Sequence, residues 1–365
     1  MDTGAGVTEE SGRHEDNPDP ALVDFVARSG LVPCGTGARF ERLPGGVSSD
    51  IWLVRAGSVA FCIKRALPRL RVAADWQAPI ERNSKEAAWI RGVAAFMPEA
   101  VPAVLAEDAE AGMFAMDYLP PRSFEGWKAK LQRGDVVLAT AGEVGRRLAR
   151  IHSRFARSPA AASDFATDAI FHAIRLEPYL LATARAHPDR AAALESLAER
   201  TAHTKLTLVH GDVSPKNILI GPQGPVFIDA ECAWFGDPAF DLAFCLNHLL
   251  LKCLWVPLAA VRLLTAFDCL AEIYLGGVDW EPREAIDRRT ARLLPGIFLA
   301  RIDGKSPVEY LTEERDKDRV RRVARYLLAD PPDCLTEIRG AWAREINLEM
   351  LRPGSLAPLA RRGAG

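Results

Sequence analysis

A short strand-rich island inside a long helical region constrains the fold of this chain more than any other feature. Residues 206–229 contain the apolar runs of "LVHGDVSPKNILI" and "PVFID", separated by the turn "GPQG". Apolar runs flanking a Gly-rich turn predict a β-hairpin. Because a hairpin brings its two ends together, we expect Asp229 to lie beside Asn217. The loop that carries Asp212 precedes the same hairpin, so the sequence predicts a cluster of polar side chains there.

The region before the island alternates short apolar runs with turns. Residues 38–67 predict three antiparallel strands and residues 101–119 predict two more. Between them, residues 82–97 have helical periodicity, with Asn83 or Ser84 as the expected N-cap. Residues 21–31 predict a further short helix. The first third of the chain is therefore predicted to form a five-stranded sheet covered by one helix.

The remaining sequence is helical in pattern, apart from the island. An α+β protein with two lobes follows: a small N-terminal antiparallel-sheet lobe and a larger, mostly helical C-terminal lobe. The expected divisions are a disordered acidic tail at residues 1–20, the N-terminal lobe at 21–120, the helical lobe at 121–353 and a flexible tail at 354–365. The acidic tail is too poor in apolar residues to be a signal peptide.

The composition excludes several classes of partner. The 365 residues include 46 basic and 48 acidic side chains, a net charge of −2, so no basic excess favours nucleic acid or an anionic membrane. The most apolar stretch, residues 242–261, is interrupted by polar side chains and predicts a buried helix instead of a membrane span. The seven cysteines form no CxxC pair. They predict buried free thiols and a cytoplasmic protein.

The polar residues of the island fit magnesium chemistry. Asn217, Asp229 and Glu231 offer hard oxygen ligands, which suit Mg²⁺ better than zinc. Asp212 is then free to orient or deprotonate a hydroxyl group. Any one of these residues alone fits a turn equally well. The combined pattern H-G-D-x4-N and I-D-x-E favours a functional site.

The N-terminal lobe offers groups that suit a phosphate donor. Gly45, Gly46 and Ser48 lie in a turn between two predicted strands, where backbone N–H groups could cover phosphates, although such turns are commonly plain hairpins. On the next strand Lys64 shares a face with Ala60 and Cys62. It is interpreted as a phosphate contact, the alternative being a solvent-exposed lysine on an edge strand.

An acid in the following helix is the expected partner of that lysine. Glu86 falls on the apolar stripe of residues 90, 93 and 97. A carboxylate on such a stripe needs a cation, and Lys64 is the obvious candidate. Glu81 is a rival partner, but it precedes the expected N-cap.

These motifs, taken together and in this order, resemble the aminoglycoside phosphotransferase and choline kinase family of small-molecule kinases, which have a protein-kinase-like fold. "VHGDVSPKN" and "FIDAECAWFGDPAFDLAF" carry the resemblance, which extends over roughly residues 43–244. It implies ATP as donor, Asp212 as catalytic base, Mg²⁺ on Asn217 and Asp229, and Lys64 on the α/β-phosphates with Glu86 as its partner.

The resemblance implies several further roles. "FAMDYLP" is similar to a hinge, so the backbone of Asp117 to Leu119 would bind adenine, and Asp241 would brace the catalytic loop. Lys216 would contact the γ-phosphate. The spacing of Asp229 and Glu231 resembles methylthioribose and choline kinases, in which the second acid also serves the metal.

Features of the C-terminal part bear on the acceptor. The region around Arg301 faintly resembles the place of an arginine pair in methylthioribose kinases, but Ala300 replaces the neighbour, which argues against that substrate. Gly211 and the short spacing between Asp229 and Asp241 argue against a protein kinase. The residues from Asp330 onward carry as many bases as acids, which weakens a polycationic aminoglycoside as acceptor. The sequence specifies neither the hydroxyl acceptor nor the oligomeric state.

Two other classes of function remain open at this point. A metallohydrolase could use His210, Asp212 and Asp229 as metal ligands, although no second histidine lies in a ligand-like motif. A catalytically weak nucleotide-binding regulator could have the same fold, although such proteins commonly lose the base or a metal ligand, and here each position is filled.

Overall fold

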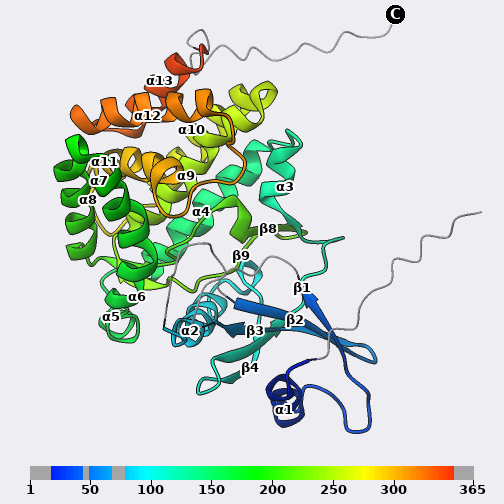
Figure 1. Cartoon of the computed structure of the whole chain (residues 1–365). Coiled ribbons are helices and arrows are strands. Elements are labelled where there is room, and N and C mark those ends of the chain that lie inside the picture. The colour runs from blue at the N-terminus through cyan, green and yellow to red at the C-terminus, as the bar shows by residue number, and fades with distance from the viewer. Residues whose placement is uncertain (1–17, 44–48, 68–78, 349–365) are drawn as a thin grey trace, which may run out of the picture.

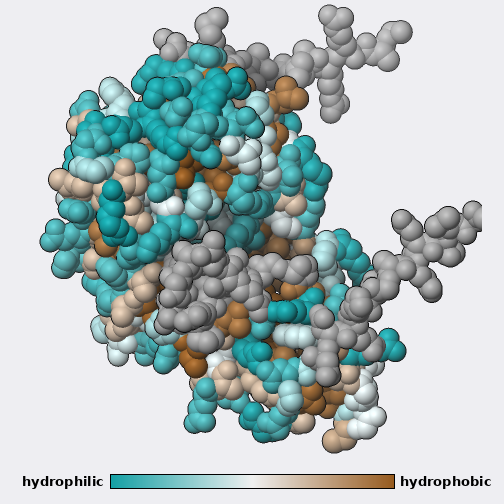
Figure 2. Space-filling view, in the orientation of Figure 1, coloured by the Kyte–Doolittle hydropathy of each residue, from teal (hydrophilic) through white to brown (hydrophobic). Residues whose placement is uncertain are grey.

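The computed structural model describes residues 18–43, 49–67 and 79–348. Figure 1 shows a small lobe built around a twisted sheet and a larger lobe of helices, which meet near α2 and the strands β8 and β9. The predicted two-lobe α+β class is confirmed. Figure 2 shows hydrophilic residues over most of the drawn face of the helical lobe, with hydrophobic residues between them in small patches.

The N-terminal sheet has five antiparallel strands in the order β1-β2-β3-β5-β4, as predicted. Its strands are β1 (Arg39–Leu43), β2 (Ser49–Ala56), β3 (Val59–Ala66), β4 (Val104–Asp108) and β5 (Met113–Asp117). Alternate residues of β3, Phe61 and Ile63, pack with helix α1 (Pro20–Ser29) in a small core. The other face of β3 therefore turns towards α2 and the helical lobe.

Helix α2 (Arg82–Ala94) begins earlier than the sequence pattern indicated. Its N-cap is Glu81, whose side chain makes no capping bond, so the predicted caps Asn83 and Ser84 are wrong. Asn83 is buried and its Nδ2 donates to the carbonyl oxygens of Lys64 (3.0 Å) and Gly112 (2.7 Å). The amide therefore links the start of α2 to the backbone of β3 and of the turn before β5.

The C-terminal lobe is a stack of helices. Its α-helices are α3 (Trp127–Gln132), α4 (Leu138–Phe155), α5 (Pro159–Asp164), α6 (Asp168–Phe171), α7 (Ala182–Ala186), α8 (Ala191–His203), α9 (Pro238–Trp255), α10 (Ala260–Gly276), α11 (Arg283–Asp303), α12 (Glu314–Ala329) and α13 (Leu335–Glu345). The π-helix η2 (His172–Leu181) joins α6 to α7, and short 3₁₀ turns are η1 (Pro98–Ala100), η3 (Pro188–Arg190), η4 (Pro215–Asn217) and η5 (Pro257–Ala259). Helix α9 packs against both α10 and α11 at the centre of the lobe.

The predicted strand island forms two small sheets. Strand β8 (Ile218–Gly221) pairs with β9 (Gly224–Phe227) as a hairpin and with β6 (Glu125–Gly126) on its other side, while β7 (Thr207–Val209) pairs with β10 (Trp234–Gly236). Arg147 of α4 holds the turn of the hairpin by donating to the carbonyl oxygens of Gln223 and Pro225. The hairpin is thereby fixed to the helical lobe, and its open end faces the N-terminal lobe.

The predicted buried helix over residues 242–261 is confirmed only in its first part. Every residue from Pro238 to Leu254 is buried, but α9 ends at Trp255 and Leu258 in η5 is fully exposed. Within the described residues, no helix is both long and apolar enough to cross a membrane. All seven cysteines are free thiols. Burial was correctly predicted for Cys62, Cys232, Cys245 and Cys253, and it is wrong for Cys34, Cys269 and Cys334, which are exposed or half-buried.

Candidate active site

A buried carboxylate of α9 fixes the backbone of the loop between β7 and β8. Asp241 of α9 accepts hydrogen bonds from the backbone N–H groups of His210 (2.7 Å) and Gly211 (2.8 Å). Its side chain is fully buried, and His152 Nε2 lies 3.2 Å from it. Asp241 therefore fixes the backbone of the loop and does not face a reactant.

Gly211 is required by the shape of this loop. Its φ angle is 77°, and a Cβ atom there would lie 2.5 Å from the carbonyl oxygen of Cys232. Any side chain would clash with backbone, because real Cβ contacts are longer than this. The close approach ties the loop to the segment that follows β9.

Asp212 is a buried carboxylate with three polar neighbours. Its Oδ2 accepts from Asn217 Nδ2 at 2.8 Å and lies 2.9 Å from a guanidinium nitrogen of Arg175. Lys216 Nζ stands 3.8 Å from the same oxygen, on a side chain that is 58% exposed. Asp212 and Asn217 thus meet as predicted, and Asp212 is held in one orientation.

Arg175 was missed by sequence reasoning. It lies on the π-helix η2, is 6% exposed, and donates to the carbonyl oxygens of Gly211 and Ile174 in addition to pairing with Asp212. The charge of Asp212 raises the pKa of Arg175 in opposition to burial, so the guanidinium stays charged. The sequence feature that could have indicated its role is that it is the one arginine in the largely apolar run "FHAIRLEPYL". π-Helical segments are often found at functional sites.

The second acid returns beside the loop through the hairpin. The N–H group of Ile228 donates to the carbonyl oxygen of Asn217 at 3.0 Å, which places Asp229 next to Asn217 as expected. Asp229 has a φ angle of 68°, in the left-handed region. Its carboxylate accepts from Lys64 Nζ. Burial opposes its ionisation, but the charges of Lys64 and Lys216 outweigh that, and the pKa of Asp229 is well below its usual range.

Lys64 joins the two lobes. Strand β3 lies at the centre of its sheet, and Lys64 is 2% exposed, so the alternative of a solvent-exposed edge lysine is wrong. Its Nζ lies 2.5 Å from Glu86 Oε2 and also pairs with Asp229 across the lobe boundary. Burial lowers the pKa of Lys64, but the charges of Asp229 and Glu86 raise it more, so the pKa of the lysine lies above its usual range.

The donor set at the hairpin fits a magnesium ion. Asn217 and Asp229 supply an amide and an ionised carboxylate, both hard oxygen donors. Glu231 is held elsewhere, since its Oε2 accepts from Arg82 Nε at 3.1 Å. That arginine is buried in α2, so this pair is a second bridge between the lobes. The structure brings Asn217 and Asp229 together and turns Glu231 to Arg82.

His210 does not form a hydrolytic metal site. Its Nδ1 accepts from the backbone N–H of Asp212 at 3.2 Å, so Nε2 carries the proton that is donated to Ile228 O at 3.1 Å. Burial lowers the pKa of His210 against the attraction of Asp241. Among the residues that the structure describes, no three His, Cys, Asp or Glu side chains converge on a metal position. The metallohydrolase alternative is therefore not supported.

Comparison with known proteins decides the family. The model of the phosphotransferase enzyme family matches residues 39–263, which is more than half of the chain and runs from β1 to the start of α10. The chain belongs to the phosphotransferase enzyme family. Its reaction class is therefore the transfer of a phosphoryl group to a small molecule.

Individual relatives are distant. A probable ketoamine kinase of Escherichia coli O157:H7 is 27% identical over 234 residues, which cover 57% of this chain and 72% of that protein. Among solved structures, choline kinase from Streptococcus pneumoniae is 16% identical, covering 85% of this chain and 99% of that one with a TM-score of 0.46. An aminoglycoside phosphotransferase from Alicyclobacillus acidocaldarius is 12% identical, covering 92% and 98%, with a TM-score of 0.45.

The remaining predicted nucleotide contacts of this phosphotransferase are at the lobe junction or outside the described residues. Gly45, Gly46 and Ser48 lie outside them. The N–H group of Asp117 already donates to Ala103 O at 3.0 Å. For Leu119, no backbone acceptor occurs in the part of the chain that the structure describes. Of the predicted hinge residues Asp117 to Leu119, Asp117 is thus the one whose N–H group is already donated to a backbone acceptor among the described residues.

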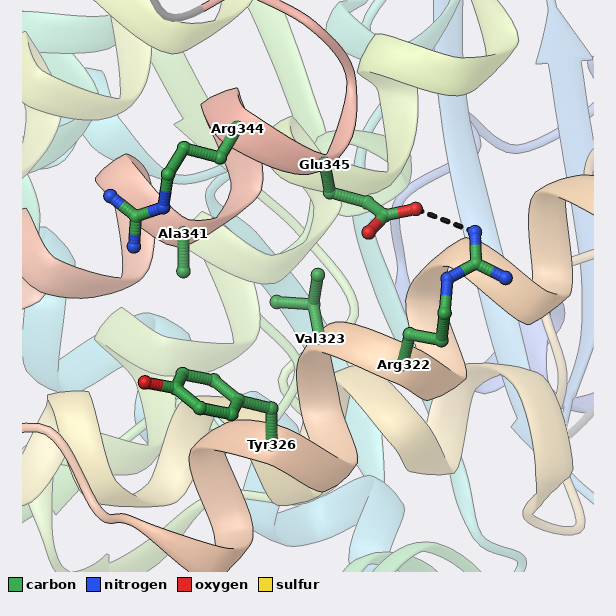
Figure 3. A pocket seen from close by; sticks show the side chains of 6 residues that line it. All are labelled: Arg322, Val323, Tyr326, Ala341, Arg344 and Glu345. Carbon is green, nitrogen blue, oxygen red and sulfur yellow. Dashed lines mark hydrogen bonds and ion pairs between the residues drawn. The ribbon is translucent and has the colours of Figure 1, made fainter.

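A surface pocket far from this chemistry lies between α12 and α13 (Figure 3). Its lining residues are Arg322, Val323, Tyr326, Ala341, Arg344 and Glu345. Arg322 and Glu345 pair at 2.6 Å across its rim. The pocket holds no acid–amide pair and lies at the end of the helical lobe away from the sheet (Figure 1), so it is not where the phosphotransferase acts.

Proposed function

We propose that this phosphotransferase moves the γ-phosphoryl group of ATP to a hydroxyl group of a small molecule. The observation that supports this most strongly is that Lys64 of one lobe contacts Asp229 of the other, beside Asn217 and Asp212. A fixed cation, a metal-binding pair and a positioned carboxylate are the groups that phosphoryl transfer requires, because the reaction depends mainly on positioning and charge neutralisation.

In this proposal the N-terminal lobe, residues 21–120, holds the nucleotide. Lys64 contacts the α/β-phosphates, and Glu86 keeps its ammonium group in place at 2.5 Å. The N–H group of Leu119 binds the adenine edge.

The helical lobe, residues 121–353, holds the acceptor. Asp212 orients the acceptor hydroxyl and takes its proton late in the transfer, while Asn217 and Arg175 fix the carboxylate through Oδ2. The exposed Lys216 contacts the γ-phosphate. Asn217 and Asp229 would hold Mg²⁺, which when bound neutralises charge on the phosphates. Glu231 positions the lobes through Arg82 and acts on the metal only indirectly.

Coupled ADP release tests the proposal. Purified protein with Mg-ATP would be offered neutral sugars, sugar acids, sugar phosphates, choline, homoserine, methylthioribose and a kanamycin-type aminoglycoside. Asp212→Asn would serve as the matched variant, since it changes one atom and leaves the loop braced by Asp241. ADP release that depends on an acceptor and is lost in the variant would support the proposal.

Other outcomes separate the alternatives. Tight ATP binding in calorimetry, with no acceptor-dependent ADP release from a broad panel, would favour the nucleotide-binding regulator. Absence of ATP binding would contradict the nucleotide site at Lys64. Equal turnover by wild type and Asp212→Asn would remove Asp212 from its role as base.

A further inference from the structure

A second set of charged side chains begins one helical turn from the catalytic loop. Along α9, residues 241, 244, 248, 252 and 255 share one face at spacings of three or four. The face starts at Asp241 beneath the loop. It continues through Phe244 and His248 to Lys252, a further rise of about 12 Å from Phe244. The α9 face therefore leads away from Asp212 into the helical lobe.

A series of contacts connects Asp212 to that face. The guanidinium of Arg175, which pairs with Asp212, lies 5.8 Å from the ring centre of Phe244. Phe244 packs against the ring of His248 at 5.5 Å, and His248 Nδ1 lies 3.3 Å from the hydroxyl of Tyr310. Helix α3 packs against both α9 and the turn η4, which carries Lys216 and Asn217.

Lys252 is the most unusual member of this set. It is 1% exposed, and within the described residues it has no carboxylate partner. Its Nζ instead lies 4.6 Å from the ring centre of Trp255 and 4.3 Å from that of Tyr310, which stack on each other. Cation–π contacts contribute about 2 kcal/mol at desolvated sites, less than the several kcal/mol that burying an ammonium group costs.

Arg301 of α11 also has no carboxylate partner within the described residues. It is 9% exposed and donates to Ser306 and to the hydroxyl of Tyr179, but its Nε is buried without any hydrogen-bond partner in the described residues. Buried charges are normally paired with an opposite charge. Among the described residues, the carboxylate whose charge acts on both cations is the exposed one of Glu309, so an anion bound here would have to displace it.

The charges that surround this place are mostly positive. Burial and four cations lower the pKa of His248 well below its usual range; the four are Arg301, Lys252, Lys216 and Lys128. The opposing carboxylate is that of Glu309, which lies in the segment between α11 and α12. It pairs with Lys128 of α3, and its side chain is 64% exposed. Burial and Lys128 lower the pKa of Lys252 to about 7, with Glu309 acting against them.

We propose that Lys252, Arg301 and Lys128 form a subsite for an anionic group of the acceptor, a carboxylate or a phosphate ester, which replaces Glu309. This inference rests on the proposed phosphotransfer to a hydroxyl group at Asp212, and it names the class of acceptor. A cationic acceptor is disfavoured, because the ring faces that would attract it are already occupied by Lys252.

Sulfate titration tests the subsite without any need for turnover. Thermal unfolding would be followed against sulfate concentration at constant ionic strength in wild type, Lys252→Met, Glu309→Gln and, as a control, Lys317→Met on α12. We expect the sulfate midpoint to rise about tenfold or more in Lys252→Met, the value of a charged hydrogen bond. It should fall in Glu309→Gln, which removes the competing carboxylate, and stay unchanged in the control.

An equal midpoint in wild type and Lys252→Met would overturn the subsite. In a second arm, ADP release would be compared for maltose, maltobionate and maltose 1-phosphate, which share the hydroxyl groups of their non-reducing glucose unit, and for kanamycin. A preference for one of the two anions that Lys252→Met removes supports the proposal and tells carboxylate from phosphate. Kanamycin as the better acceptor overturns it. A sulfate site in a protein that releases no ADP would count against the phosphotransfer proposal and not against the anion site.

Discussion

Lys64 in the N-terminal lobe and Lys252 in the helical lobe are equally buried, at 2% and 1% exposure, but their partners differ. Lys64 sits between the carboxylates of Glu86 and Asp229. Lys252 sits over two aromatic rings and faces Lys128. The pKa of Lys64 is raised, whereas that of Lys252 is lowered to about 7.

The comparison shows that fixed carboxylates, and not the depth of burial, decide the charge state of a buried lysine. Desolvation lowers the pKa of both ammonium groups. At Lys64 the chain supplies the compensating charge, so the cation is present before any ligand arrives. At Lys252 compensation would have to come from a ligand. One lysine thus suits a constant phosphate contact, and the other suits recognition of an anion.

The largest effect is expected on turnover, from a substitution at Asp212. Asp212→Asn should keep ATP binding and lower turnover by ~10²–10⁴-fold, the scale of losing a general base. Steady-state kinetics with the best acceptor, together with calorimetry for ATP, measure both quantities. Since Asn217 and Arg175 lose part of an ionic partner, the unfolding midpoint would be recorded as a control. A matching loss of ATP affinity would instead mean that the variant disturbs the nucleotide end.

Removal of Lys64, the lysine with carboxylate partners, should lower the free energy of unfolding. Lys64→Met leaves Glu86 buried without its cation, and breaking a buried pair on one side costs about 3 to 5 kcal/mol. Urea unfolding measures this loss. The double variant Lys64→Met/Glu86→Gln should recover part of it, because it removes the uncompensated carboxylate. If the double variant were no more stable than the single one, the pair would not be the source of the loss.

The uncompensated lysine should behave in the opposite way. Lys252→Met keeps the aliphatic volume beneath Trp255 and Tyr310 and removes a poorly compensated charge, so it should raise the free energy of unfolding at pH 7. We expect about 1 to 4 kcal/mol, the range found when apolar residues replace buried ionic groups. Urea unfolding beside Lys317→Met checks the sign. A destabilised Lys252→Met would show that the rings compensate the ammonium group fully.

The sequence predicted the first of these lysines and not the second. Lys64 and Glu86 were found because strand and helix periodicity put each on a defined face, and a carboxylate on an apolar stripe implies a cation nearby. The hairpin likewise predicted the approach of Asp229 to Asn217. The α2 N-cap failed because Asn83 satisfies carbonyl groups from residues 19 and 29 positions away, which no local pattern records.

Arg175 and Lys252 were missed for a related reason. Both lie in apolar helical runs, where a single charged residue looks like an interruption of the pattern. Lys252 is such an interruption in residues 242–261. Their roles depend on contacts between η2, α9, α11 and the segment that carries Tyr310. Helix periodicity gives the face on which a residue lies but not the distant segment that packs against it. Acceptor recognition was therefore the least predictable part of the site.

The pH dependence of stability offers the most specific test of the comparison. Lysine in an unfolded chain has a pKa of roughly 10.4, whereas that of folded Lys252 is about 7. Between these values the unfolded chain binds a proton that the folded protein lacks, so this lysine makes stability rise with pH, by at most about 1.4 kcal/mol per unit. Below about pH 7 both states are protonated and its contribution is constant.

The difference in the free energy of unfolding between wild type and Lys252→Met isolates the contribution of Lys252, because the two proteins share all other titrating groups. The stability advantage of Lys252→Met over wild type should therefore shrink as the pH rises from 7 to 9 in urea unfolding. Bound sulfate stabilises the charged lysine and raises its folded pKa, so saturating sulfate should move the change to higher pH. A constant difference between the two proteins from pH 7 to 9 would mean that Lys252 keeps its proton as firmly as Lys64 does, and the contrast between the two lysines would be lost.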